Sequence, residues 1–149
     1  MIRRIYVDNY KCLVNFELPL DELTLLIGSN GVGKSAVLDV VFSLRQLLSG
    51  AARVLDTGNF TASTRTRWQD VPVQIVEVDV ALGDDDFKYR IEIEHDQVSR
   101  KARILRELLT SRGKALFAFE MGEVRLYRDD HSEGPRFPSD WSESALARV

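Results

Sequence analysis

The 149-residue sequence contains a single cysteine, Cys12, and only four prolines. One cysteine excludes a disulfide within the chain, and with it the class of small secreted domains that are held together by disulfides. No apolar run approaches the roughly 20 residues that a membrane-spanning helix needs, and the N-terminus lacks the apolar segment of a signal peptide. These absences predict a protein of the reducing cytoplasm with no membrane partner.

An excess of basic charge is also missing. Hydrophobic residues make up 44% of the chain and charged residues 29%, and the formal net charge is −3. This balance is typical of an ordinary globular protein, and its negative sign argues against a chain that is basic as a whole and clamps nucleic acid. The length predicts one domain or part of one.

The strongest motif lies at residues 28–35 and fits G-x-x-x-x-G-K-[ST], the phosphate-binding P-loop. The apolar run at 23–27 predicts a buried strand before it. Apolar residues at helical spacing predict a helix over about 33–48 after it, ending at Ser49-Gly50. Strand, loop and helix in this order are the context that the motif requires. The alternative is a glycine-rich turn that holds no ligand.

The residue types suit the phosphates of a nucleoside triphosphate. Glycine lets the backbone adopt positive φ and approach an anion closely, and the first N–H groups of the helix then point at the phosphates. Lys34 is expected to reach the β and γ oxygens, and Ser35 to offer its hydroxyl to Mg²⁺. The candidate nucleotide-binding residues are Gly28, Ser29, Asn30, Gly31, Val32, Gly33, Lys34 and Ser35.

The segments around the motif are read from their periodicity. Residues 2–7 and 13–18 are rich in strand-forming types and predict two strands, which are joined by a turn at 8–11. Residues 51–70 show no sustained period and predict a long loop.

The rest of the chain predicts β structure followed by a tail. Alternating apolar residues over 71–128 predict four or five antiparallel strands. A slip of phase near Ile75 predicts a bulge or burial on both faces. Residues 99–111 fit a helix or a strand. Residues 129–149 are polar and predict a poorly packed tail, of which 142–149 begin a further helix.

A second motif, Arg4-Ile5-x-Val7-x-Asn9-Tyr10-Lys11-x-Leu13, precedes the glycine-rich one. Together they resemble the N-terminal part of ABC-type ATPases of the RecF/SMC branch. Within that branch the sequence is most similar to the bacterial AAA-labelled "predicted ATPase" proteins related to the OLD nucleases. The resemblance implies an α/β fold with α+β character, in which a P-loop core with a mixed sheet carries an added antiparallel β-subdomain. It implies ATP and Mg²⁺ as cofactors.

The same resemblance implies a division of the chain into one incomplete ATPase lobe. Residues 1–50 would supply the strands, the P-loop and its helix, and 51–70 a long loop. Residues 71–128 would form the β-subdomain, and 129–149 would lead into a missing C-terminal half.

ATP hydrolysis in the family requires parts that this sequence lacks. No run of four apolar residues is followed by Asp-Glu, so the Walker B strand is missing. Leu48-Ser49-Gly50 is similar to the family's signature but ends a helix, where the signature should begin one. His95 and His131 lack the context of a switch histidine and are expected to be solvated. The chain is therefore expected to bind ATP with little or no hydrolysis by itself, and to act in the complete protein as part of a homodimer.

Further family roles fall on single residues. Lys11 follows the turn that lies near the nucleotide in similar proteins, and the alternative is a solvated turn lysine. Three glutamines are candidates for the family's Q-loop, namely Gln69, Gln74 and Gln97. Gln74 lies within a strand and is read as a polar surface residue.

Several other clusters have a functional and a plain interpretation. A basic cluster could follow a DNA backbone, although a solvated face is the simpler reading; it comprises Arg100, Lys101, Arg103, Arg106, Arg112 and Lys114. Trp68 and Trp141 could stack on bases. Asp84 to Asp86, together with Asp79, could form a cation site, but we interpret the three consecutive residues as a solvated turn. Cys12 is read as a small packing residue.

Two other functions remain as alternatives. One is a nucleotide-switched module that binds DNA or a nuclease partner through the β-rich region. The other is a stand-alone P-loop kinase or GTPase, which is weakened because the guanine-reading Asn-Lys-x-Asp sequence is missing.

Overall fold

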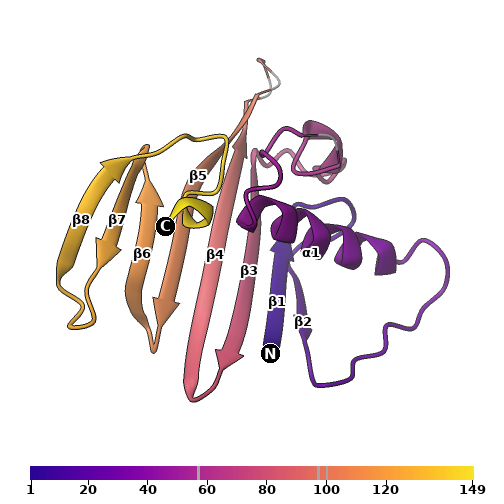
Figure 1. The fold of residues 1–149 in the computed structure, drawn as a ribbon. Helices are drawn as coiled ribbons and strands as arrows, with labels where there is room; N and C mark the ends of the chain where they lie inside the picture. The colour runs from indigo at the N-terminus through magenta and orange to yellow at the C-terminus, as the bar shows by residue number, and fades with distance from the viewer. Residues whose placement is uncertain (57, 97, 100) are drawn as a thin grey trace.

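The computed structural model describes residues 1–56, 58–96, 98–99 and 101–149. Its centre is one eight-stranded sheet with the order β2-β1-β3-β4-β5-β6-β7-β8, and every pair of neighbours is antiparallel (Figure 1). The strands are β1 (Ile2–Asp8), β2 (Phe16–Pro19), β3 (Val73–Leu82), β4 (Asp85–His95), β5 (Ala102–Ser111), β6 (Lys114–Glu120), β7 (Glu123–Tyr127) and β8 (Glu133–Pro138).

Tight turns explain the antiparallel pairing of β3 with β4, of β5 with β6 and of β6 with β7. The hairpins turn at Gly83, Gly113 and Gly122, whose φ values of 62°, 77° and 79° lie in the left-handed region. Glycine enters this region without steric cost, and turns of this hand match the twist of hairpin strands. Because such short turns reverse the chain, the strands they join pair antiparallel.

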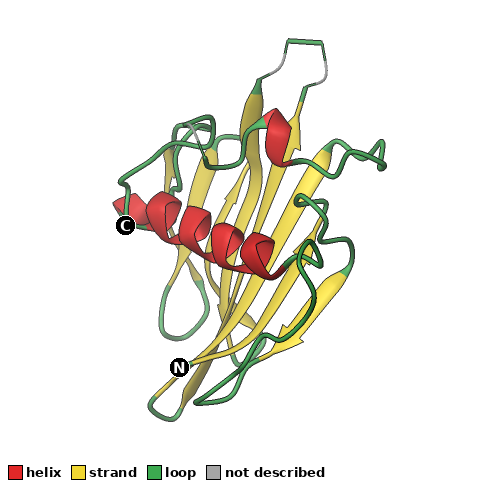
Figure 2. Cartoon of the chain, turned by 90° about the vertical axis from the view of Figure 1, so that its right-hand side faces the viewer, coloured by secondary structure: helices red, strands yellow, loops and turns green. Residues whose placement is uncertain are grey.

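The helix α1 (Lys34–Leu48) lies across one face of the sheet (Figure 2). It confirms the predicted helix. Its buried apolar residues recur at helical spacing and pack against the apolar residues of β1, β3 and β4. On the helix these residues are Ala36, Val37, Val40, Leu44 and Leu47. Two short 3₁₀ helices, η1 (Ala62–Thr64) and η2 (Leu146–Arg148), lie in the long loop and near the C-terminus.

The opposite face of the sheet is charged. Arg4 pairs with Glu17 at 2.9 Å and with Glu77 at 3.2 Å, and Arg90 contacts both Glu77 and Glu92. Opposite charges on neighbouring strands each contribute a few tenths of a kcal/mol to about 1 kcal/mol. This face therefore carries charge of both signs that is largely paired.

The expected α/β core with a mixed sheet is wrong. Within the described ranges α1 is the only α-helix, and the sheet has no parallel pair. The reason lies at residues 23–27, which form no strand; Leu23, Leu25 and Ile27 are 90%, 77% and 83% exposed. A strand needs a neighbour for its backbone hydrogen bonds, and no described segment pairs with this one.

Three smaller expectations are also corrected or decided. The strands expected within 71–128 are β3 to β7, but they continue the sheet of β1 and β2 instead of forming an added subdomain. The ambiguous segment 99–111 contains a strand, β5. The tail is not poorly packed, because β8 pairs with β7 and Ser144 and Ala145 are buried.

The slip of phase near Ile75 marks no bulge between β3 and β4. Their pairing runs without a shift from Val73 to Leu82. The buried position that breaks the apolar pattern is occupied by Gln74, which is 1% exposed.

Among the described residues, no helix has both the length and the hydropathy that a membrane span requires.

Candidate functional site

The glycine-rich loop (residues 28–35) runs directly into the N-terminus of α1. Gly31 and Gly33 have φ values of 89° and 102°, which favour glycine. Gly33 is the N-cap residue of the helix. A Cβ atom at this position would lie only 2.8 Å from the Sγ atom of Cys12. The loop is therefore packed closely against the turn that follows β1.

Lys34 folds back onto this loop. Its Nζ atom donates hydrogen bonds to the carbonyl oxygens of Gly28 and Ser29, at 2.6 and 2.8 Å. Ser35 follows it as the second residue of the helix and is exposed. A positive ammonium group, a hydroxyl group and the N-terminus of a 15-residue helix thus meet at one point, which is an arrangement that favours an anion.

A hollow of about 530 Å³ opens beside the loop. Its size is in the range of small-ligand pockets. Its lining residues are Lys11, Cys12, Asn30, Gly31, Gly33, Lys34, Ser35, Ala36 and Asp39. Five of the predicted site residues and Lys11 are thus brought together. Gly28 and Ser29 hold Lys34 from outside this lining, and the Val32 side chain is 57% exposed.

Asp39 is a site residue that the sequence analysis missed. Its Oδ2 atom lies 2.5 Å from Nζ of Lys11, and this bond raises the pKa of the Lys11 ammonium group. The available signal was its spacing, because Asp39 follows Ser35 by four residues and so shares its helix face. The ion pair fixes Lys11 beside the hollow.

The donor set suits a metal ion only in company with a ligand. Ser35 offers one hydroxyl group and Asp39 one carboxylate, which Lys11 already engages. In the described ranges no group of three or more His, Cys, Asp or Glu side chains is placed to hold a metal. Mg²⁺ keeps several waters and commonly takes phosphate oxygens as ligands, so these residues fit a metal that arrives with a phosphate chain.

Of the candidate glutamines, Gln74 is a buried residue whose side chain bonds to the backbone of the fold. It is not a polar surface residue, because its amide group is buried and hydrogen-bonded to the backbone of Asn9 and Thr64. Gln69 lines a separate hollow with Arg65. Gln97 lies outside the described residues.

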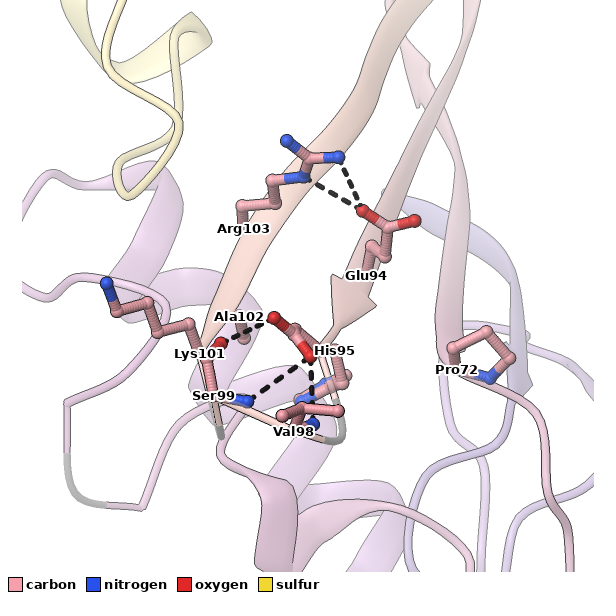
Figure 3. A pocket seen from close by; sticks show the side chains of 9 residues that line it. Pro72, Glu94, His95, Val98, Ser99, Lys101, Ala102 and Arg103 are labelled. Carbon is pink, nitrogen blue, oxygen red and sulfur yellow. Dashed lines mark hydrogen bonds and ion pairs between the residues drawn. The ribbon is translucent and has the colours of Figure 1, made fainter.

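His95 is also not solvated. It is 4% exposed, and burial together with the charge of Arg65 lowers the pKa of its imidazole to about 4. It borders an open hollow at the end of the β4–β5 hairpin, drawn in Figure 3. In that view Arg103 and Glu94 point toward each other across the two strands, at 2.8 Å.

The basic cluster is largely paired. Arg103, Arg106 and Arg112 contact Glu94, Glu120 and Asp85 respectively. Lys101 and Lys114 are exposed, and Arg100 lies outside the described residues. Because carboxylates offset Arg103, Arg106 and Arg112, the described part of the cluster presents no continuous basic track for a phosphate backbone.

The two tryptophans differ in their surroundings. The Trp141 ring packs edge-on against Phe119, with centroids 5.8 Å apart, and beneath the guanidinium of Arg103. It is therefore engaged within the protein. Trp68 is 68% exposed in the long loop.

Comparison with known proteins adds an independent line of evidence. The model of a family described as AAA ATPase domain matches residues 1–105. An OLD nuclease from Thermus scotoductus is 42% identical over 41 residues, which cover 28% of this chain and 8% of that protein. The matched segment thus spans a small part of the relative's length. Because the family match covers more than half of the chain and includes the glycine-rich loop, the chain belongs to the family of AAA ATPase domains.

Proposed function

We propose that the chain binds ATP with Mg²⁺ at residues 28–35, which act as a P-loop (Walker A) of the kind found in the RecF/SMC/OLD-like branch. The observation that supports this most directly is the hollow that gathers Lys34, Ser35 and Lys11 at the N-terminus of α1. Lys34 would exchange the carbonyl oxygens of Gly28 and Ser29 for phosphate oxygens. Ser35 would supply a ligand to the Mg²⁺ ion that accompanies the nucleotide.

The chain further acts as the N-terminal lobe of a composite ATPase. Catalysis of phosphoryl transfer needs a carboxylate that holds the metal and a group that orients water. Asp39 lines the hollow as its one carboxylate among the described residues and is paired with Lys11. Leu23, Leu25 and Ile27 are exposed beside the loop, and contiguous exposed apolar residues mark interaction sites. A companion lobe that covers them, together with dimerisation, would complete the site.

The partner that this lobe serves is a nuclease module. The relative's printed name, OLD nuclease, supports this choice. The alternative of a DNA-binding switch is less supported, because the described arginines of the basic cluster are paired with carboxylates.

Calorimetry with Mg-ATP tests the proposed site. Lys34→Ala should weaken binding by about 10- to 100-fold, which is the loss of one hydrogen bond to a charged group. Lys114→Ala, an exposed lysine on β6, is the matched control and should bind as the wild type does. Unchanged binding by Lys34→Ala would contradict the proposed site.

A phosphate-release assay on the same samples tests the composite nature of the enzyme. The chain alone should release no phosphate above the rate of Lys34→Ala. Robust turnover by the wild-type chain would show that it contains its own catalytic carboxylate, and the proposal of a companion lobe would fall while that of ATP binding stood.

A further inference from the structure

A buried polar network connects the end of β4 with the turn that carries Lys11. The Nε2 atom of His95 lies 2.7 Å from Oε1 of Gln74 on β3. The Nε2 atom of Gln74 in turn donates to the carbonyl oxygens of Asn9, at 2.9 Å, and Thr64, at 3.1 Å. All four residues are at most 5% exposed. The network therefore runs inside the protein and not over its surface.

The partners fix the orientation of each side chain. Because the Gln74 NH₂ group faces two carbonyl oxygens, its own oxygen must face His95. Because an amide oxygen can only accept a hydrogen bond, the imidazole must carry its proton on Nε2 and donate a hydrogen bond to Oε1 of Gln74. The lowered pKa of His95 keeps the imidazole neutral. Donors and acceptors thus alternate along the network without a mismatch.

The network ends on a strained turn. Asn9 and Lys11 have φ values of 60° and 53°, which are uncommon for residues other than glycine. Conformations of this kind are unfavourable and persist only where the surroundings enforce them. Here the backbone N–H of Lys11 donates to the same Thr64 carbonyl at 2.6 Å. Gln74 and Lys11 are therefore joined through one oxygen atom.

Asn9 holds the same turn from its side chain. Its amide group donates to the carbonyl oxygens of Val71 and Val73, at 2.7 and 2.9 Å, and its oxygen accepts from the backbone N–H of Thr66, at 3.1 Å. The turn is thus tied to β3 and to the long loop at several points. Beyond the turn, Lys11 reaches Asp39 and the hollow beside the glycine-rich loop.

We propose that Gln74 and His95 are positioning residues for the nucleotide site, which act by holding the Asn9–Lys11 turn so that Lys11 stands beside the glycine-rich loop. This inference rests on the proposed binding of Mg-ATP. It assigns a role to two polar side chains that touch no part of the hollow. The same hydrogen bonds also connect the end of β4, at His95, to the turn that carries Lys11.

A double-mutant cycle tests the route of the effect. Gln74→Met keeps the length of the side chain and removes its amide group; it should weaken Mg-ATP binding about tenfold. Lys11→Ala should weaken binding by a similar factor. Because Gln74 acts through Lys11, the double variant should bind like Lys11→Ala alone and not a hundredfold more weakly than the wild type. Gln46→Met, in the last turn of α1, is the matched control and should bind normally.

Cys12 gives a second readout that needs no nucleotide. It is the only cysteine, it is exposed, and it follows Lys11 on the same turn. Its reaction with an aromatic disulfide reagent therefore reports the conformation of the turn. Gln74→Met should accelerate this reaction about threefold or more, because the freed turn lets the thiol group move away from Gly33, beside which it lies. His95→Leu, which removes one bond of the network, should give a smaller change in the same direction.

The outcomes separate the two proposals. Additive losses in the cycle, or a folded Gln74→Met that binds Mg-ATP normally with an unchanged Cys12 rate, would overturn the positioning role. Unfolding of both Gln74→Met and His95→Leu would show a purely structural role and would also overturn it. A wild-type chain that binds no Mg-ATP, combined with a faster Cys12 reaction in Gln74→Met, would reject the proposed function and leave the control of the turn standing.

Discussion

His95 is a neutral imidazole held in the interior by a hydrogen bond to Gln74. Its ordinary pKa is 6.5, and in the folded protein burial and the charge of Arg65 lower that pKa to about 4. Between these two pH values His95 is protonated in the unfolded chain and neutral in the folded chain. The native state therefore loses stability as the pH falls through this window, and the loss is complete below about pH 4.

The expected size of this loss is on the order of 3 kcal/mol. Urea unfolding of the wild type and of His95→Gln between pH 7 and pH 4 measures it, and the free energy of unfolding should fall more steeply for the wild type. The comparison is needed because burial raises the pKa of Glu107, which acts in the opposite direction in the same window. Parallel pH curves for the two proteins would contradict the buried, neutral histidine.

Candidate site residues could be picked out from the sequence where their spacing is local. Lys34 and Ser35 lie within one contiguous motif, and the structure places both at the same hollow. Gln74 and His95 were interpreted as surface residues, because each stands in an alternating strand where a polar residue is usually exposed. The buried amide group of Gln74 contacts Asn9, which lies 65 positions away, and His95 contacts Gln74, which lies 21 positions away.

One buried carboxyl group anchors the C-terminal segment to the strands of the sheet. Glu107 on β5 is fully buried. It accepts hydrogen bonds from the Tyr89 hydroxyl at 2.7 Å, the Ser144 hydroxyl at 2.5 Å and the backbone N–H of Ala145 at 2.9 Å. The last of these lies just before η2, so that the carboxyl group also caps the turn. A polar tail is thereby fixed against the apolar face of the sheet.

Removal of this group should cost the fold about 3 kcal/mol, because Glu107→Ala leaves buried donors without a partner. Glu120→Ala provides the matched control. Its carboxylate is exposed and pairs with Arg106 on the sheet surface, and such a pair contributes at most about 1 kcal/mol. Urea denaturation compares the two variants. An equal, small loss in both would mean that the tail is not anchored through Glu107.

The sequence alone predicts the helix α1, but it does not decide the structure of residues 23–27 and 99–111. The helix α1 carries its apolar period, its glycine N-cap and its end within its own sequence. Residues 23–27 have the composition of a strand, but a strand forms only where a second backbone pairs with it. For 99–111 the apolar residues fit both periods, and the hairpins with β4 and β6 decide for a strand.

The whole molecule is a sheet with two unlike faces. One face carries paired charges and meets solvent, and the other carries the apolar core beneath α1. Exposed apolar residues depart from this division at residues 23–27 and on the outer side of α1, where Leu38 and Phe42 are 65% and 56% exposed. Both positions lie near the glycine-rich loop in sequence. The proposed companion lobe would cover this side of the molecule.

Replacement of Leu23, Leu25 and Ile27 by serine tests whether these residues serve a partner rather than the fold. Because these side chains are exposed, the free energy of unfolding of the triple variant should lie within about 0.5 kcal/mol of the wild-type value. The control Val76→Ser lies in the core at 2% exposure and should lose about 2–4 kcal/mol. In a protein that carries the companion lobe, the same three substitutions should reduce ATP turnover and lower its stability. A large loss of stability in the present chain would show that these side chains already pack within it, and the case for a covering lobe would lose its main support.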